Sequence, residues 1–371
     1  MDIQRFLKFF KVGWRIYRDP LLESSHSSIY YWREQMKAMA LFTTTEERLL
    51  PYRSTWHTLA FFIMFKTYYF CWYGDELDQV ISDLDALHPW AQKGPHPVEY
   101  QTGKRWYFVM AFFLATLWSF FLCIFLLLLI TSPMWVHQQN LPFHAAFPFQ
   151  WHDKSLHPIS HAMIYLFQSY FAVYCLTWLL CIEGLSVFIY AEITFGIEVL
   201  CLELRHIHRH NHGPKELRME TNRLVKLHQK IVEILDRTND VFHGTLIMQM
   251  GVNFSLVSLS VLEAVEARKD PKVVAQFAVL MLLALGHLSM WSYCGDLLSQ
   301  KSLQISEAAY EAYDPTKGSK DVYRDLCVIM TRGQKPMIMR ANPFPSFNLI
   351  NYSAILNQCY GILTFLLKTL D

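Results

Sequence analysis

Four histidines in one short stretch are the residues whose type and spacing best suit the binding of a metal ion. The stretch "RHIHRHNHG" (residues 205–213) holds two pairs spaced four apart, His206 with His210 and His208 with His212. On a helix each pair would share one face and could supply two zinc ligands. No cysteine or carboxylate cluster completes a site, and the stretch is otherwise basic. The pattern therefore indicates the solvated end of a helix, and we predict no metal and no cofactor.

Patterns for other kinds of chemistry are also missing. The sequence contains no motif for hydrolysis, nucleotide binding or phosphate binding. Its net charge of +1 provides no basic excess with which to bind nucleic acid. Most of the cysteines lie in or beside apolar runs and no CxxC pair is present, which favours buried free thiols. We therefore predict neither an enzyme nor a nucleic-acid-binding protein.

The composition points to a lipid bilayer as the surroundings of the chain. Charged residues make up 18% and hydrophobic residues 53%, whereas a soluble chain is usually about a quarter charged. A helix needs about 20 mostly apolar residues to cross the hydrocarbon. The segments that meet this length are residues 54–74, 106–132, 162–182, 245–262, 273–295 and 341–367. Lys66 lies inside the first of them, and we expect its ammonium group to reach the cytoplasmic surface.

The placement of lysine and arginine predicts the orientation in the membrane. Residues 197–244 are rich in both, which indicates a cytoplasmic loop, while residues 137–161 contain a single lysine and are expected outside. The basic N-terminal segment 1–28 can then be cytoplasmic only if the more charged stretch 29–50 also crosses. We therefore predict an all-α polytopic membrane protein in which residues 29–371 form seven transmembrane helices. The N-terminus is expected in the cytoplasm and the C-terminus outside the cell.

This orientation is the reverse of that of a G-protein-coupled receptor. No DRY motif follows the third span, and "NPFPSF" at residues 342–347 is not the NPxxY motif of that class. The chain also lacks an internal repeat of the kind found in many transporters. A G-protein-coupled chemoreceptor remains one alternative, and a transporter is a weaker one.

The end of the chain is similar to a known receptor family. Residues 293–314, "YCGDLLSQKSLQISEAAYEAYD", together with residues 330–368 resemble the C-terminal third of insect odorant receptors. The matching features are Gly295-Asp296, Ser302, Ala308 with Tyr310, Gln334-Lys335-Pro336 and Tyr360. The expected orientation and the basic second cytoplasmic loop also match. The related gustatory receptors share the fold and stay an alternative, but their TYhhhhhQF ending is absent here.

The resemblance implies a function and a partner. Members of the family bind small volatile odorants and gate a nonselective cation pore as subunits of a tetramer. The usual assembly is a heterotetramer of a tuning subunit with the olfactory co-receptor Orco, which carries a long insertion in the second cytoplasmic loop. That loop is short here, so the chain resembles a tuning subunit. The resemblance places it in the cell membrane of an olfactory neuron dendrite.

An odorant pocket needs apolar and aromatic walls with one or two polar groups that orient the ligand. The outer halves of the predicted spans offer Phe62, Phe65, Phe121, Tyr165, Ser169, Tyr170, Met250, Asn253, Phe277 and Met281. Ser169 and Asn253 are the stronger candidates, because a polar group at membrane depth needs a partner. The alternative is that the aromatic residues only pack the bundle.

The last apolar run is predicted to line the pore. It contains the amides Asn357 and Gln358, which plain lipid-facing helices do not need. The residues Leu356, Tyr360, Leu363 and Leu367 fall on one helical face, and Leu366 stands where the co-receptor has a glutamine. By the resemblance, the apolar gate of the family lies here, and apolar constrictions can close a pore by excluding water. A lipid-facing leucine stripe is the alternative.

Overall fold

The regular structure of the described residues is entirely helical. The computed structural model describes residues 56–92, 97–135, 141–142, 151, 154–208, 213–266, 271–315 and 319–370, and no strand occurs among them. The predicted first span 29–50 and the N-terminal segment 1–28 lie outside these residues. The helices are α3 (Trp56–Trp72), α4 (Gly74–Gln92), α5 (Pro97–Trp135), α6 (Pro158–His206), α7 (Pro214–Glu266), α8 (Pro271–Glu311), α9 (Lys320–Gly333) and α10 (Leu349–Leu370).

Proline begins each of the long helices α5 to α8. Its fixed φ suits the first helical turn, where the missing N–H has no partner to lose. At the start of α7 the backbone N–H of Gly213 also donates to Glu216 Oε2 over 3.1 Å. A carboxylate at this position offsets the unpaired N–H groups and the positive end of the helix dipole. The local sequence thus explains where these helices begin.

The long helices extend well beyond the apolar segments of the sequence. Helices α5 to α8 contain 39, 49, 53 and 41 residues. At 1.5 Å per residue they are roughly 60 to 80 Å long, about twice the thickness of the hydrocarbon layer. The predicted spans 106–132, 162–182, 245–262 and 273–295 are therefore parts of longer helices. By length and composition, stretches of three described helices could cross a membrane: Val98–Leu128, Pro158–His206 and Ala278–Glu311.

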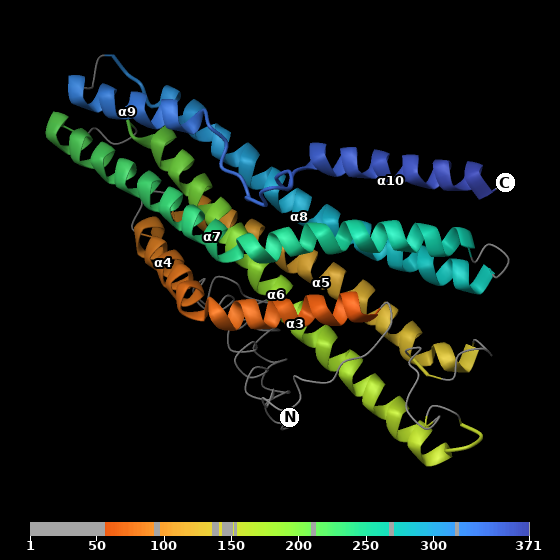
Figure 1. Cartoon of the computed structure of the whole chain (residues 1–371). Helices are drawn as coiled ribbons and strands as arrows, with labels where there is room; N and C mark the ends of the chain where they lie inside the picture. The colour runs from red at the N-terminus through yellow and green to blue at the C-terminus, as the bar shows by residue number, and fades with distance from the viewer. Residues whose placement is uncertain are drawn as a thin grey trace.

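The helices form an elongated bundle with α6 at its centre (Figure 1). Helix α6 packs along α5 and α8, and α8 also packs along α7. At one end of the bundle α9 lies against the last part of α8. Towards the other end α10 packs against α7 and α8. The end of α6 and the start of α7 lie at one end of the bundle, and the end of α7 and the start of α8 lie at the other (Figure 1).

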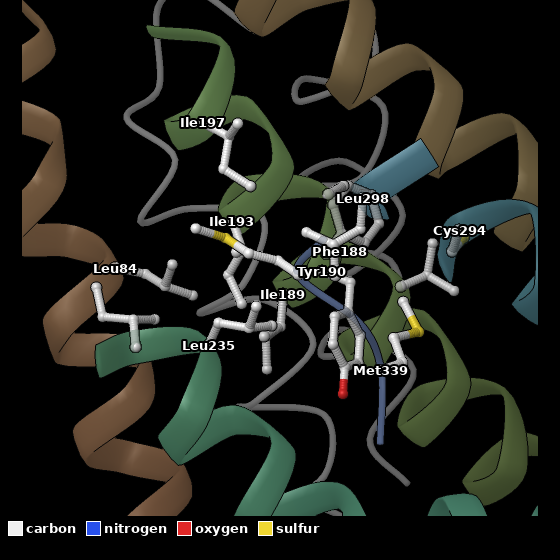
Figure 2. Close-up of a cluster of buried hydrophobic side chains, with 14 of the residues drawn as sticks. Leu84, Phe188, Ile189, Tyr190, Ile193, Ile197, Leu235, Cys294, Leu298 and Met339 are labelled. Atoms are coloured by element: carbon white, nitrogen blue, oxygen red, sulfur yellow. The ribbon is translucent and has the colours of Figure 1, made fainter. Parts of the chain in front are cut away.

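The core is centred on the middle of α6, where residues 181–191 are buried without interruption. A helix that is apolar on all sides is stable only when neighbours surround it. Figure 2 shows Ile189 and Tyr190 of α6 among side chains from several other elements. These are Leu84 of α4, Leu235 of α7, Leu298 of α8 and Met339, which precedes α10. The core thus joins the long helices to the segment that leads into the last one.

The segment of residues 334–348 has no helix but is fixed by hydrogen bonds. Asn239 of α7 donates its amide N–H to the carbonyl of Ile338 over 3.0 Å and accepts the N–H of Arg340 over 3.1 Å. Ser302 Oγ of α8 accepts the N–H of Met337 over 2.9 Å. Such partners are required because buried backbone groups are costly to leave unpaired. The position of α10 is therefore set by α7 and α8.

Candidate functional site: a buried polar network between the helices

A buried ion pair lies inside the bundle. The ammonium group of Lys66 on α3 contacts the carboxylate of Glu183 on α6, and the two side chains are 3% and 2% exposed. Lys66 Nζ also donates to Gln249 Oε1 of α7 over 2.7 Å. Removing charges from water costs several kcal/mol per ion, so such groups persist only when they are paired and hydrogen-bonded. The expected position of Lys66 at the membrane surface is wrong, because burial against Glu183 gives the ammonium a partner inside.

The second carboxylate oxygen of Glu183 extends the network to α8. It accepts the indole N–H of Trp291 over 2.8 Å and lies 3.1 Å from His287 Nε2. His287 Nδ1 is hydrogen-bonded to the amide nitrogen of Gln249. A neutral imidazole with its proton on Nε2 satisfies both contacts, since it donates to the carboxylate and accepts from the amide.

An aromatic ring covers this network on one side. The indole of Trp118 on α5 stacks on the imidazole of His287, with ring centroids 4.5 Å apart and an angle of 12° between the planes. All of these side chains are buried. The network therefore joins α3, α5, α6, α7 and α8 through polar groups held out of water, where hydrogen bonds are strong and unpaired groups are costly.

Two predicted pocket residues lie within about one helical turn of this network. Met250 and Asn253 follow Gln249 on α7 and are 4% and 3% exposed. The amide nitrogen of Asn253 is buried and has no hydrogen-bond partner within the described part of the chain. The hydroxyl oxygen of Ser169 on α6 is also buried and has no hydrogen-bond partner among the described residues. A buried polar group without a partner costs about 1–3 kcal/mol, so both are placed where an additional partner would be favourable.

The other predicted pocket residues do not form one group. The hydroxyl of Tyr165 donates to the carbonyl of Ile130 over 2.8 Å and so ties α6 to α5. Phe65 packs on Tyr69, with ring centroids 5.6 Å apart, and Met281 is half-buried beside Val257, Ala284 and Cys359. Two further residues, Phe121 and Tyr170, are 48% and 71% exposed. The side chains of Phe62 and Phe277 lie outside the part that the structure describes.

The predicted pore residues lie on α10. Cys359 and Ile355 face the bundle, where they pack with Val257 and Ala284. Leu356 is half-buried, and Tyr360 is 69% exposed on another face of the helix. The side chains of Leu363, Leu366 and Leu367 lie outside the described residues.

Sequence reasoning misses most of the buried network. The hydropathy pattern gives Glu183 only the role of ending one span, and it assigns no role to Gln249, His287 or Trp291. A usable signal is present, because Lys66 and Glu183 carry opposite charges within or beside different apolar segments. Charged groups at membrane depth usually pair with one another. Which groups pair depends on how the helices cross, and this cannot be read from the segments one at a time.

Two other features of the molecule do not form a site. A hollow of about 30 Å³ between α4, α5, α6 and α7 is lined by Tyr100, Glu192 and apolar side chains. It has room for about one water molecule, far less than a ligand pocket needs. Within the described ranges, no group of three or more His, Cys, Asp or Glu side chains could hold a metal ion. His210 and His212 of the histidine pairs lie outside those ranges.

One family of known proteins matches most of the chain. The sequence model of the 7tm Odorant receptor family matches residues 53–360. The chain belongs to the insect odorant receptor family. The predicted resemblance is confirmed, and the family is a class of receptors and not of enzymes.

Relatives of this odorant receptor occur in Drosophila melanogaster. It is 86% identical to "Putative odorant receptor 65b", with the whole of both chains aligned, and 70% identical to "Putative odorant receptor 65c". It is 40% identical to "Odorant receptor 65a", covering 99% of this chain and 96% of the relative.

A solved structure supports the fold. The odorant receptor is similar to the insect olfactory receptor OR5 from Machilis hrabei, solved in complex with eugenol, with a TM-score of 0.62. The two share 14% sequence identity, and the similarity covers 92% of this chain and 88% of the other. At this identity the comparison establishes the fold. The predicted all-helical membrane fold is confirmed.

Proposed function

We propose that this odorant receptor binds a small volatile ligand within its helix bundle and thereby opens a nonselective cation pore. It would do so as the tuning subunit of a heterotetramer with the co-receptor Orco, in the cell membrane of olfactory neuron dendrites. The N-terminal segment would lie in the cytoplasm and the end of α10 outside the cell. The buried, unpaired amide of Asn253 is the observation that carries the ligand-binding part of the proposal.

The surroundings of Asn253 suit a small apolar molecule. Its neighbours on α7 are Met250 and Val257, which are 4% and 2% exposed, and Met281 of α8 packs near Val257. Methionine adapts to ligands of different shape because its side chain is flexible and polarizable. A ligand with one hydrogen-bond acceptor would pair with the Asn253 amide while its apolar part packs against Met250 and Val257. Ser169 is the second polar group proposed for the pocket.

The exposed face of α10 supports the pore part of the proposal. One face of the helix packs on α7 and α8 through Ile355 and Cys359. Asn357, Gln358 and Tyr360 are exposed on other faces. Amides at membrane depth need water or another helix as a partner, which a pore shared by four subunits would provide. Leu356, Leu363, Leu366 and Leu367 are the residues proposed to form its apolar lining and gate.

The proposal can be tested by patch clamp of cells that express the chain with and without Orco. We expect a fast, odorant-evoked cation current in the co-expressing cells that does not depend on the supply of G protein. An odorant panel that includes eugenol is a reasonable start, because the solved OR5 structure contains it. A robust current from this chain alone would contradict the need for the co-receptor. A response that disappears when G proteins are blocked would favour a G-protein-coupled mechanism instead.

A further inference from the structure

The buried ion pair is connected to the start of α10 through one aromatic contact. Trp291, whose indole N–H donates to Glu183, lies against the ring of Phe347, with ring centroids 6.1 Å apart. Phe347 is 2% exposed and stands two residues before α10 begins at Leu349. The same indole thus touches the charged network on one side and the entry to the last helix on the other.

Backbone packing makes this contact close and rigid. Gly295 lies one helical turn after Trp291 on α8, and a Cβ at this position would collide with the carbonyl oxygen of Phe347. The backbone at residue 347 therefore rests directly on α8. Protein interiors are close-packed and transmit small displacements instead of absorbing them. A shift of Trp291 relative to α6 would accordingly move the segment that positions α10.

The network also reaches the proposed ligand site. Gln249 accepts from Lys66 and is hydrogen-bonded to His287. Asn253 lies four residues further along α7, so the two amides share one face of the helix. A ligand held by Asn253 would therefore act on the helix that supplies Gln249, a partner of the Lys66 ammonium.

We propose that the Lys66–Glu183 ion pair and Trp291 are positioning residues that hold the start of α10 in the arrangement of the ligand-free receptor. The consequence of this positioning for the pore rests on the pore role proposed above for α10. Stability alone is a weak reason for such a pair, because replacing a buried ion pair by neutral groups of similar size is often neutral or stabilising. Its directional hydrogen bonds instead select one relative placement of α3, α6 and α8.

The test compares three variants of the full chain, co-expressed with Orco and then purified in detergent. Lys66→Met/Glu183→Gln removes both charges together, retains similar side-chain sizes and leaves an amide oxygen at position 183 that can accept from Trp291. Trp291→Phe removes the indole N–H and retains a ring against Phe347. Arg205→Met is the matched control, since the Arg205–Glu311 pair also joins α6 to α8 but its side chains are 38% and 47% exposed.

Two readouts separate positioning from general stability. Hydrogen exchange by mass spectrometry follows residues 347–361, and thermal unfolding follows the whole protein. We expect the double variant to unfold near the wild-type temperature while residues 347–361 exchange roughly tenfold faster, equivalent to about 1.4 kcal/mol in the opening equilibrium. Trp291→Phe is expected to show a smaller effect in the same residues. Arg205→Met should leave exchange there unchanged.

Three outcomes would overturn the proposal. The first is unchanged exchange at residues 347–361 in the double variant. The second is an equal rise throughout the protein, which would indicate a general loss of stability. The third is a double variant that fails to fold, which would make the ion pair a requirement for folding and nothing more.

Patch clamp without any odorant then tests the link to the pore. A raised ligand-free cation current in the double variant, absent from Arg205→Met, would support both the positioning role and the pore role of α10. A second result would be faster exchange at residues 347–361 without a current from any variant, and without a current from the wild type even when odorant is present. This result would support the positioning role and contradict the proposed channel function. The experiments therefore distinguish a failure of the positioning proposal from a failure of the proposed channel function.

Discussion

Asn239 and Arg340 are 101 residues apart in the chain, and the backbone N–H of Arg340 donates to Asn239 Oδ1 over 3.1 Å. The amide of the same asparagine donates to the carbonyl of Ile338, so one side chain on α7 satisfies two backbone groups of the segment before α10. The side chain of Arg340 also pairs with Asp236, one turn earlier on α7. The entry to the last helix thus depends on α7 as well as on α8.

Replacing Asn239 by alanine is expected to destabilise the receptor. The N–H of Arg340 and the carbonyl of Ile338 would each lose a partner, and a buried unpaired group costs about 1–3 kcal/mol. Thermal unfolding of the purified protein in detergent measures this loss as a lower transition temperature. Asn222→Ala, at an exposed position of the same helix, is the control and should unfold like the wild type. Equal transition temperatures for the two variants would show that other contacts hold residues 334–348 in place without Asn239.

Gly295→Ala should damage the packing of α8 against residue 347. The added methyl group would collide with the backbone carbonyl of Phe347, which cannot rotate away as a flexible side chain could. We expect lower surface expression and a lower unfolding temperature. Gly251→Ala is the matched control on α7, because nothing lies within 4 Å of the added methyl group and alanine favours a helix by about 1 kcal/mol over glycine. If both variants behave alike, the close contact at Gly295 is not required.

His228 should make stability fall in mild acid. It is 5% exposed on α7, and burial, followed by the positive charge of Arg332, lowers its pKa from 6.5 to about 4. The unfolded chain therefore binds a proton between these pH values that the folded chain does not, so stability is complete above pH 6.5 and declines as the pH falls towards 4. The loss from this group is at most about 3 kcal/mol.

The His228→Leu variant isolates this contribution from that of the other histidines. His228 Nε2 has no hydrogen-bond partner among the residues described, so leucine leaves no group unpaired. We expect the variant to be at least as stable as the wild type at neutral pH. Its unfolding temperature should fall less than that of the wild type as the pH is lowered from 6.5 to about 4. A parallel fall in both proteins would place the titrating group elsewhere.

Asn253 and Ser169 should determine how well an odorant binds. Removing a hydrogen bond to the ligand by Asn253→Leu or Ser169→Ala is expected to weaken potency by about 1 kcal/mol, or roughly fivefold. The concentration dependence of the evoked current, with surface expression measured in parallel, is the readout. Tyr170→Ala serves for comparison, because the side chain is 71% exposed and should have a smaller effect. Unchanged potency in both Asn253→Leu and Ser169→Ala would move the pocket to another part of the bundle.

Leu363 on α10 is the residue proposed to close the pore. Leu363→Ala or Leu363→Ser should raise the current without odorant or change ion permeability, because a smaller or polar side chain weakens an apolar constriction. Odorant potency should change little. Ile350→Ala, at the opposite end of α10 and 79% exposed, controls for changes in the helix as such. Normal leak and permeability in both Leu363 variants, at normal surface expression, would remove the gate from this position.

Much of the fold could be read from the sequence because each local rule depends on neighbouring residues only. The apolar runs at residues 106–132, 162–182, 245–262 and 273–295 lie within helices of the structure, and these helices begin at Pro97, Pro158, Pro214 and Pro271. The ends of those helices were not predicted. Hydropathy stops at the first charged residue, whereas the helices continue past it, since charged side chains are compatible with helical structure once they lie outside the hydrocarbon.

The sequence by itself determined the family, the helical membrane fold and the residue types available for a pocket and a pore. Only the tertiary structure decided that Lys66 pairs with Glu183, 117 residues away, and that Trp291 connects this pair to Phe347. It also decided that Asn253 is buried with its amide nitrogen unpaired in the described part of the chain. The physical reason is that helix periodicity specifies which residues share a face, while the partner of each face depends on how whole helices cross. A buried charge has only a few possible partners, and the packing of the entire bundle selects one.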